Sequence, residues 1–378
     1  TKAYQICARC VMDTSDPEIT FDSDGICNHC HHFDLVTSKR WFPNEEGARL
    51  LSESLDLIRE SGKSKDYDCI IGLSGGVDSS YLALKAKEWG LRPLVVHVDA
   101  GWNSELAVSN IEAIIRHCKY DLHTIVIDWE DIRELQLSYL KSGLANQDVP
   151  QDHVFFASLY EYAVRNKVKY VLSGGNIATE AIAPAAWEGS AMDSISLKTI
   201  QSKFGTRNLY SYRTVSPLEY YLIYPFFYGM RTIRPLNFMP YNKEMAIASL
   251  VEIGWRPYGR KHGESRFTKF FQNYYLPEKF GYDKRRPHLS SLIVSGQMNR
   301  DQALRALEEP LYDPADLASD FAFFCKKLGI TEHEFRELLK QPNRQHADFD
   351  NWASYQKLVK LVQRALKVVR GRDVNVYS

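Results

Sequence analysis

The run GLSGGVDSS at residues 72–80 joins a short apolar segment, DYDCII, to a segment with helical periodicity, YLALKAKEW. This order of a strand, a tight turn and a helix recurs along the first half of the chain. Strands that alternate with helices form βαβ units, whose strands lie parallel and are covered by helices on both faces. The sequence therefore predicts an α/β fold built on a doubly wound parallel sheet.

The remaining elements follow from the same patterns. Strands are expected at residues 67–73, 92–98, 122–127 and 169–175. Helices are expected at 48–60, 79–90, 104–118, 129–140 and 153–166. Beyond about residue 240 the pattern becomes helical and aromatic. We therefore expect three units, namely a zinc-binding module at 1–45, the sheet domain at 46–240 and a mainly helical substrate or partner region at 241–378.

Two cysteine pairs with C-x2-C spacing predict the N-terminal module: Cys7, Cys10, Cys27 and Cys30. Pairs of this kind form tetrahedral zinc sites, and a site with four protein ligands is structural because no position stays open for a substrate. The segment between the pairs predicts a small hairpin that turns at Asp24–Gly25. Two alternatives remain, a pair of disulfides or a histidine from residues 29–32 in place of one thiolate.

The composition restricts the class of protein. Lys and Arg number 47 and are balanced by 47 Asp and Glu, so no net positive field favours nucleic acid. No apolar run approaches the roughly 20 residues that span a bilayer, and the first residues show no apolar signal segment. We expect a cytoplasmic protein with no membrane span and no nucleic-acid partner.

The glycine-rich turn itself predicts an anion site. Gly75 and Gly76 let the backbone approach a ligand closely, and the amides at the start of the helix point toward it. Ser74 and Ser79 add hydroxyl donors. Asp78 beside bound phosphates suggests a divalent cation between them. The alternative is a plain glycine-rich turn in which Asp78 caps the helix.

The loop SGGVDS at 74–79 resembles the S-G-G-x-D-S loop of the N-type ATP pyrophosphatases, the PP-loop superfamily with an adenine nucleotide alpha-hydrolase-like fold. These enzymes cleave ATP between its α and β phosphates and adenylate an oxygen of the substrate. The resemblance implies ATP and Mg2+, with VVHVDAGW at 95–102 and SGGNIATE at 173–180 on the same edge of the sheet. Glu180 in the second of these is either a ligand of ATP or its metal, or an acid at a helix start. The implied ATP contacts are Ser74, Gly75, Gly76, Asp78, Ser79, Val98, Gly174, Gly175 and Asn176.

Six blocks in order are similar to those of the N-acetyl sugar amidotransferases of lipopolysaccharide and flagellin-glycan biosynthesis. The blocks are the cysteine pairs, SGGVDSS, HVDAGW, SGGNIATE, YGRKHGES with FTKF, and GYDKRRPHLSSLI with SGQ. This family converts an acetamido group into an acetamidino group. The resemblance implies a nucleotide-linked diacetamido sugar as substrate, an adenylated imidate, and release of AMP and pyrophosphate.

The last two blocks supply candidate side chains for this chemistry. Besides Asp78, the candidates for catalysis are Lys261, for the β and γ phosphates, and His262 with Glu264 as an acid–base pair for ammonium. A plain salt bridge is the alternative for that pair. The run DKRRPH is suited to the phosphates of a nucleotide sugar or to a uronate, or else is a solvated helix end; its candidates are Lys284, Arg285, Arg286 and His288.

The source of ammonia is the last question. Glutamine hydrolysis needs an activated cysteine, and Cys69, Cys118 and Cys325 all lie in apolar runs. We expect a separate glutaminase subunit, and the resemblance implies one like the histidine-biosynthesis glutaminase, working with a cyclase-like barrel protein. The aromatic segment 216–241 is either core or a surface for a partner or substrate. The alternative functions are a tRNA-thiolating PP-loop enzyme, which needs a catalytic cysteine or an iron–sulfur cluster, and a non-enzymatic nucleotide sensor.

Overall fold

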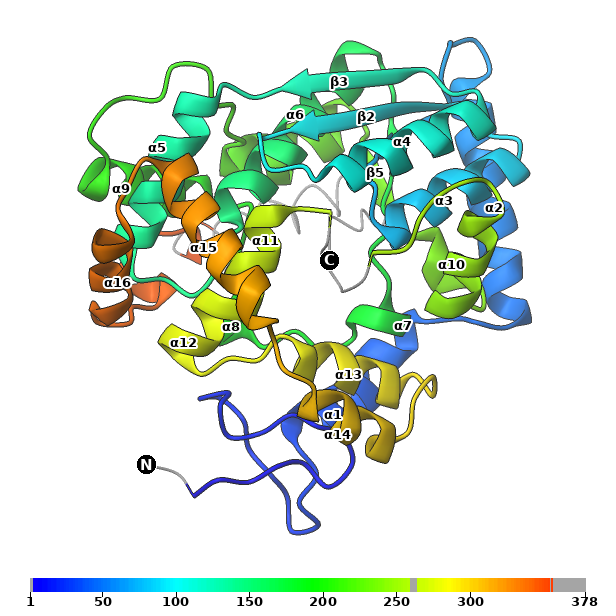
Figure 1. Ribbon diagram of the computed structural model, residues 1–378. Coiled ribbons are helices and arrows are strands. Elements are labelled where there is room, and N and C mark those ends of the chain that lie inside the picture. Colours follow the sequence, from blue (N-terminus) through cyan, green and yellow to red (C-terminus); the bar gives the residue numbers. More distant parts are fainter. Residues whose placement is uncertain (1–2, 259–263, 354, 356–378) are drawn as a thin grey trace.

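The computed structural model describes residues 3–258, 264–353 and 355 of the chain. Five parallel strands form one sheet in the order β3-β2-β1-β4-β5 (Figure 1). The chain adds β2 and β3 on one side of β1, then crosses back to add β4 and β5 on the other, so the predicted doubly wound sheet is confirmed. The strands are β1 Cys69–Gly72, β2 Pro93–Asp99, β3 Leu122–Val126, β4 Tyr170–Leu172 and β5 Arg231–Ile233.

Apolar side chains alternate between the two faces of the sheet, as the period of a strand requires. Helix α6 (Val149–Arg165) covers one face, where it packs on side chains such as Ile70, Val96 and Val171. The other face is covered by α2 (Glu45–Gly62), α3 (Val77–Glu88), α4 (Glu105–Cys118) and α10 (Lys243–Val251). Both faces of the sheet are therefore buried beneath helices.

The remaining helices, most of them short, lie mostly beyond the sheet. The α-helices are α1 Asn28–His32, α5 Trp129–Ser142, α7 Ile177–Glu180, α8 Ala185–Glu188, α9 Ser194–Phe204, α11 Arg266–Phe270, α12 Leu276–Phe280, α13 Arg285–Val294, α14 Arg300–Glu308, α15 Pro314–Leu328 and α16 Glu332–Lys340. Wider π-helical segments cover Phe33–Thr37, Glu219–Phe227 and Phe271–Tyr275, and 3-10 helices cover Ser38–Arg40, Pro235–Phe238 and His346–Asp348. No helix in the described ranges is both long enough and apolar enough to cross a bilayer.

Strand β5 is the strand of the sheet that the sequence analysis missed. It is only three residues long and follows a π-helical segment that contains Pro225. The surrounding aromatic run is partly core and partly surface, because Tyr224 is buried whereas Phe227 is 84% exposed. This mixture hides the strand from a search for buried apolar segments.

The C-terminal helices join the sheet through Trp102, which lies just beyond β2. Its ring centroid is 5.2 Å from that of Phe267 and 5.7 Å from that of Phe324. Its indole Nε1 donates a hydrogen bond to Gln136 Oε1 at 3.0 Å. Aromatic contacts of this kind bury a large area, so α11 and α15 are held beside the carboxyl edge of the sheet (Figure 1).

Helix α13 connects the N-terminal module to the rest of the protein (Figure 1). On the module side, Ser290 Oγ accepts a hydrogen bond from Val11 N at 3.1 Å. Toward the sheet, Ser291 Oγ accepts one from Ile182 N at 2.9 Å. Two neighbouring serines on one helix therefore bond to segments on either side of it.

Candidate active site

A cavity of about 1790 Å3 opens at the carboxyl edge of the sheet. Residues that end or follow β1, β2, β4 and β5 line it, together with α6 and residues of the 264–288 segment. Ligand pockets commonly measure about 300–1,000 Å3. The cavity therefore has room for more than one substrate.

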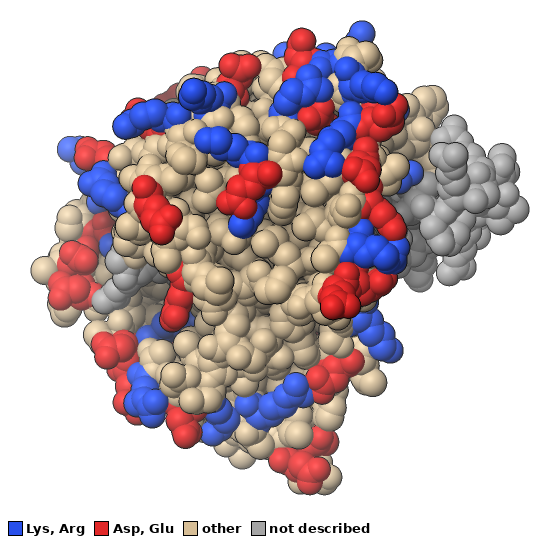
Figure 2. Space-filling model, turned by 90° about the vertical axis from the view of Figure 1, so that its right-hand side faces the viewer, with Lys and Arg blue, Asp and Glu red and all other residues tan. Residues whose placement is uncertain are grey.

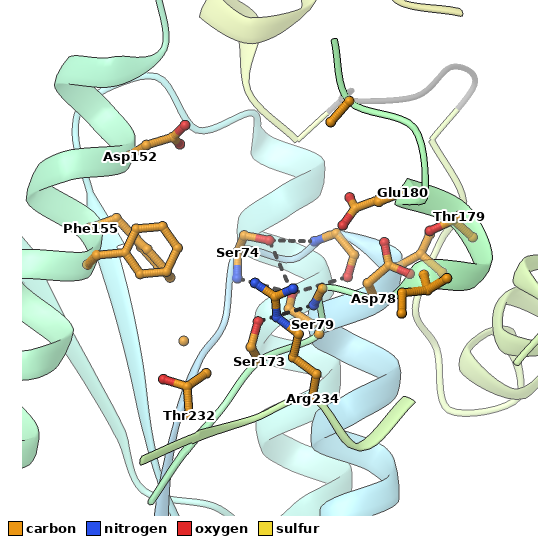
Figure 3. A pocket seen from close by; sticks show the side chains of 18 of the residues that line it. Ser74, Asp78, Ser79, Asp152, Phe155, Ser173, Thr179, Glu180, Thr232 and Arg234 are labelled. Atoms are coloured by element: carbon orange, nitrogen blue, oxygen red, sulfur yellow. Dashed lines mark hydrogen bonds between the residues drawn. The ribbon is translucent and has the colours of Figure 1, made fainter. Parts of the chain in front are cut away.

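The loop after β1 forms one wall of this cavity (Figure 3). Gly75 has φ +85°, and a Cβ there would lie 2.8 Å from the carbonyl oxygen of Ala107, so only glycine fits. Its own carbonyl accepts hydrogen bonds from Trp255 Nε1 at 3.1 Å and Tyr258 OH at 2.9 Å. Helix α3 begins after Gly76 without a side-chain cap. Its first amides can therefore donate to a bound anion.

The serine hydroxyls of the loop lie together beside the N-terminus of α3. Ser74 Oγ and Ser79 Oγ are 3.1 Å apart, and Ser74 Oγ also accepts from Gly76 N at 3.2 Å. Both side chains line the cavity. They add hydroxyl donors beside the helix dipole, which is the arrangement expected of a phosphate site.

Asp78 lies inside α3, so the alternative that it caps this helix is wrong. Its Oδ1 accepts hydrogen bonds from Asn176 Nδ2 at 3.2 Å and from the hydroxyl of Tyr241. Burial raises the pKa of Tyr241 well above its usual value, and the nearby Asp78 raises it further, so the phenol remains a donor. These bonds hold the Asp78 carboxylate at the cavity wall.

The loop after β4 packs against the first turn of α3. A Cβ on Gly174 would lie 2.9 Å from the carbonyl carbon of Asp78. A Cβ on Gly175 would lie 3.8 Å from both Arg234 Nε and Glu180 Oε2. Arg234, which Figure 3 shows pointing toward the phosphate loop, adds a cation that sequence reasoning missed because it follows the unpredicted strand β5. Arg234 could have been found from the sequence only if β5 had been predicted, because it follows this strand at the same edge of the sheet.

Val98 lies at the end of β2 and lines the cavity, as the ATP resemblance implies. The neighbouring His97 donates through Nδ1 to the carbonyl of Leu73 at 2.8 Å, so its Nε2 accepts from Asn103 Nδ2 at 2.9 Å. The ring of Phe155, on α6, packs directly against Gly72: a Cβ on Gly72 would lie only 2.4 Å from Cζ of this ring. These contacts fix the wall between the phosphate loop and β2.

The segment that contains the predicted catalytic residues is only partly described. Lys261 and His262 lie outside the described residues. Glu264 is described, and its backbone carbonyl accepts from Ser104 N at 2.9 Å. Its Oε1 lies 3.3 Å from the position of a Cβ on Gly76. The Glu264 carboxylate is therefore adjacent to the phosphate loop.

The basic run before and within α13 separates into two groups. Lys284 and His288 line the cavity, and His288 Nδ1 donates to the carbonyl of Thr179 at 3.2 Å. Arg285 instead pairs with Asp283 at 2.7 Å, and Arg286 donates to the carbonyl of Val11 at 2.8 Å. Residues four apart share a helix face whereas their neighbours do not. The structure therefore brings Lys284 and His288 to the cavity but not the two arginines.

The wall formed by α6 carries acidic residues that sequence reasoning did not name. Asp152 faces the cavity (Figure 3), and Asp148 is nearly buried at the start of the same helix. Both belong to the polar run NQDVPQD, directly before a predicted helix. This cluster of amide and carboxylate side chains could have marked the segment as a candidate part of the site.

The four N-terminal cysteines form a candidate metal centre. Their sulfur atoms all lie within 4.8 Å of one another, with 3.9 Å between Cys7 and Cys30 and 3.7 Å between Cys10 and Cys27. Tetrahedral zinc with bonds of about 2.3 Å requires sulfur atoms about 3.8 Å apart, so the donor set fits zinc. Among the residues that the structure describes, this is the group of ligands close enough to hold an ion.

The details of the module remove most of the alternatives for this site. No disulfide joins any of the seven cysteines. His29 and His31 pair with Asp16 at 2.6 Å and Asp22 at 2.7 Å, away from the sulfur atoms. The predicted hairpin is present as an antiparallel bridge between Phe21 and Cys27, with Gly25 at φ +76°.

Comparison with known proteins gives one family match. Residues 264–363 match a family described as LPS biosynthesis protein WbpG-like, C-terminal domain. No curated protein matches the chain. Similar solved structures include an NH3-dependent NAD synthetase from Campylobacter jejuni, in complex with nitrate, with 13% identity, coverage of 57% of this chain and 99% of that chain, and a TM-score of 0.28.

An NMN synthetase from Francisella tularensis is similar at 16% identity, covering 57% of this chain and 98% of that chain with a TM-score of 0.29. TM-scores this low carry no argument about the present chain, whose fold rests on its own strand order. The family match, in contrast, includes residues that line the cavity, among them Glu264, Lys284 and His288. Residues 264–363 are therefore similar to the WbpG-like C-terminal domain of lipopolysaccharide biosynthesis proteins, and we call this segment the WbpG-like domain.

Proposed function

We propose that the protein is an ATP-dependent amidotransferase that converts an acetamido group of a nucleotide-linked diacetamido sugar into an acetamidino group. The observation that supports this most is the composition of the cavity. A glycine-rich anion loop forms one wall, and a domain from a family of lipopolysaccharide biosynthesis proteins forms part of another. Binding a nucleotide and a sugar in one cavity of about 1790 Å3 allows direct transfer between them.

The residues at the sheet edge provide for ATP. The first amides of α3 and the hydroxyls of Ser74 and Ser79 would hold its phosphates, with Arg234 as a nearby cation. Mg2+ is usually held by one or two carboxylates together with substrate phosphates. Asp78 fits that role, and the ion would neutralise charge on the phosphates.

The proposed reaction needs alignment more than covalent help from the protein. The acetamide oxygen attacks the α-phosphorus, pyrophosphate leaves, and an adenylated imidate results. Ammonia then attacks the imidate carbon, and AMP leaves. Groups that hold the oxygen in line with the leaving pyrophosphate, and that compensate phosphate charge, lower the barrier for this type of step.

The cysteines support an external source of ammonia. None of the seven is among the described residues that line the cavity. Burial raises the pKa of Cys118 and that of Cys325 to about 11, and raises the pKa of Cys69 further still. Such thiols are poor nucleophiles at neutral pH because the thiolate is the reactive form. We therefore propose a separate glutaminase subunit, like that of histidine biosynthesis, together with a barrel-shaped partner.

The direct test is a reaction with ATP, ammonium and a panel of nucleotide diacetamido sugars. The expected products are AMP, pyrophosphate and a sugar that is lighter because NH replaces O. Monoacetamido sugars serve as controls for which group is modified. Absence of AMP formation with every acetamido sugar would contradict the proposal.

The second candidate is a tRNA-thiolating enzyme, which the N-terminal cysteine module favours. That chemistry needs a reactive cysteine or an iron–sulfur cluster near ATP, and the cavity as described has no cysteine. It also needs a basic surface, whereas Figure 2 shows Lys and Arg interspersed with Asp and Glu on the face in view. Transfer of sulfur to tRNA would support this candidate, and ATP binding without turnover would support a nucleotide sensor.

A further inference from the structure

Asp148 is held at the cavity by residues of the WbpG-like domain. It is 9% exposed and lines the cavity directly before α6. Thr268 Oγ1, from α11, donates to Asp148 Oδ1 at 3.0 Å. Gln272 hydrogen bonds to the same carboxylate, and Gln151 Nε2 donates to it at 3.3 Å. Three neutral donors therefore fix its position.

The position of this carboxylate is unusual for its place in the chain. Asp148 occupies the N-cap position of α6, where an aspartate commonly accepts a hydrogen bond from a backbone N–H of the first helical turn, yet its side chain accepts no such backbone bond. It turns instead toward α11 and the cavity. A helix cap does not explain why an acid stands here.

The surroundings make this carboxylate more basic than an ordinary aspartate. Burial raises the pKa of Asp148 to about 6, although the hydrogen bonds and the positive charge of Lys284 oppose the rise. The charge of Glu264 adds to it. Asp152, on the same helix, and His288, on α13, also line the cavity. At neutral pH Asp148 is therefore ionised but able to accept a proton.

We propose that Asp148 binds the N–H of the acetamido group and takes its proton as the carbonyl oxygen attacks the α-phosphorus. This inference rests on the proposed function. The N–H electron pair forms the C=N bond, and the carbonyl π pair forms the new O–P bond. The bond from the α-phosphorus to pyrophosphate breaks, and pyrophosphate leaves with that pair.

The same carboxyl group then serves the second half of the reaction. As ammonia attacks the imidate carbon, Asp148 returns its proton to the sugar nitrogen. It next takes a proton from the newly attached ammonium group, and AMP leaves with the C–O pair to give an amidinium. Asp148 holds one proton at the end of this sequence and releases it to water, so atoms and charge balance with no further reactant.

The geometry of a secondary amide supports this assignment. A trans amide is planar, and its N–H and C=O point in opposite directions. Holding the N–H at Asp148 directs the oxygen away from α6. Figure 3 shows α6, with Asp152 and Phe155, across the cavity from Ser74 and Ser79 of the phosphate loop. The oxygen would therefore point toward bound ATP.

The main test is Asp148→Asn, which keeps the shape and an acceptor for Thr268 but cannot take a proton. At a fixed concentration of unprotonated ammonia, we expect kcat to fall by about a hundredfold or more and the acid limb of the kcat–pH profile to disappear, while ATP affinity stays unchanged. Glu161→Gln makes the same chemical change on α6, where Glu161 pairs with Arg165 outside the cavity lining. That control should behave as wild type.

Thr268→Val gives a second, milder measurement that does not depend on the folding of the first variant. Loss of its hydroxyl removes a bond to the Asp148 carboxylate, so the acid limb should move to higher pH. An active wild type whose acid limb is unmoved by Thr268→Val, or whose kcat survives in Asp148→Asn, overturns this inference alone. A wild type that forms no AMP with any acetamido sugar overturns the proposed function as well.

Discussion

Arg286 and Asp13 form an ion pair in which Arg286 Nε lies 3.1 Å from Asp13 Oδ2. The Asp13 carboxylate is almost fully buried, so the pair lies within the contact between the N-terminal module and α13. Lys284, directly before the same helix, lines the cavity instead. One basic run therefore serves both the attachment of the module and the cavity.

Arg286→Gln and Lys284→Gln should have different effects. Loss of the Arg286 charge leaves Asp13 without its ion pair, and we expect the free energy of unfolding to fall by about 1–3 kcal/mol. Lys284→Gln should leave stability nearly unchanged and raise KM for the nucleotide sugar about tenfold. Chemical denaturation and steady-state kinetics on both variants separate the two roles. An increase in KM for Arg286→Gln with no loss of stability would contradict this division.

Loss of the metal should destabilise the N-terminal module and weaken sugar binding in the cavity, although the metal site is not part of that cavity. Cys7→Ser or Cys30→Ser should lower the zinc content from one ion per chain and lower Tm, because the four buried sulfur atoms form one site. KM for the sugar should also rise, since α13 is anchored on the module. Metal analysis by mass spectrometry and thermal unfolding check this. An iron chromophore in the purified protein would instead favour the thiolation alternative.

Substitutions of Asp78 and of Tyr241 should reduce AMP formation by different amounts. Asp78→Ala removes the proposed magnesium ligand, and AMP formation should fall by more than about a hundredfold in a protein with an unchanged circular dichroism spectrum. Tyr241→Phe removes only the hydroxyl that orients Asp78, and we expect a loss of about tenfold or less. Equal activity of Asp78→Ala and wild type would rule out the metal role.

The nitrogen donor should be ammonia for the isolated chain. With ammonium salts it should form AMP and aminated sugar, and the rate should rise with pH as the unprotonated fraction of ammonia rises. Glutamine alone should not support the reaction, because the buried cysteines remain thiols. Product analysis with isotopically labelled ammonium or glutamine distinguishes the donors. Glutamine use by the purified single chain would mean that one of these cysteines reacts.

His153 should contribute less to the free energy of unfolding below neutral pH. Burial lowers its pKa to about 4, while Nδ1 donates to the carbonyl of Ala191 and Nε2 accepts from Val215 N. The unfolded histidine titrates near 6.5, so the unfolded state binds more protons between the two values. The contribution of His153 to the free energy of unfolding is then complete above pH 6.5 and falls by up to about 3 kcal/mol toward pH 4. The raised pKa of Asp148 contributes with the opposite sign in this range. When the pH is lowered from 7 to 5, the free energy of unfolding should fall more, or rise less, in the wild type than in His153→Gln.

Features that depend on residues close together in the chain could be predicted from the sequence. The glycines of the phosphate loop and the C-x2-C pairs reflect local requirements, a φ of +85° at Gly75 and a tetrahedron of sulfur atoms. The short apolar strands alternate with helices of clear periodicity, and this order predicts the sheet. These features depend on near neighbours in the chain.

The missed features depend on distant contacts. Asp148 takes its character from Thr268 and Gln272, far along the chain, and Arg234 reaches the cavity only because β5 pairs with β4. The run DKRRPH could have been divided further, because the four-residue spacing of Lys284 and His288 already placed them on one face of a helix. Its two arginines instead bond to carbonyls and carboxylates that no local pattern reveals.

The hydrogen bonds from Trp255 and Tyr258 to the carbonyl of Gly75 have a consequence for the synthesis of the protein. The ribosome releases β1 and the phosphate loop long before it reaches these two side chains. A nascent chain can therefore assemble much of its sheet while the carbonyl of Gly75 still lacks both of these donors. The phosphate loop becomes pinned only when the segment that leads into the WbpG-like domain has emerged, so a prematurely terminated chain is left with an unfinished nucleotide site.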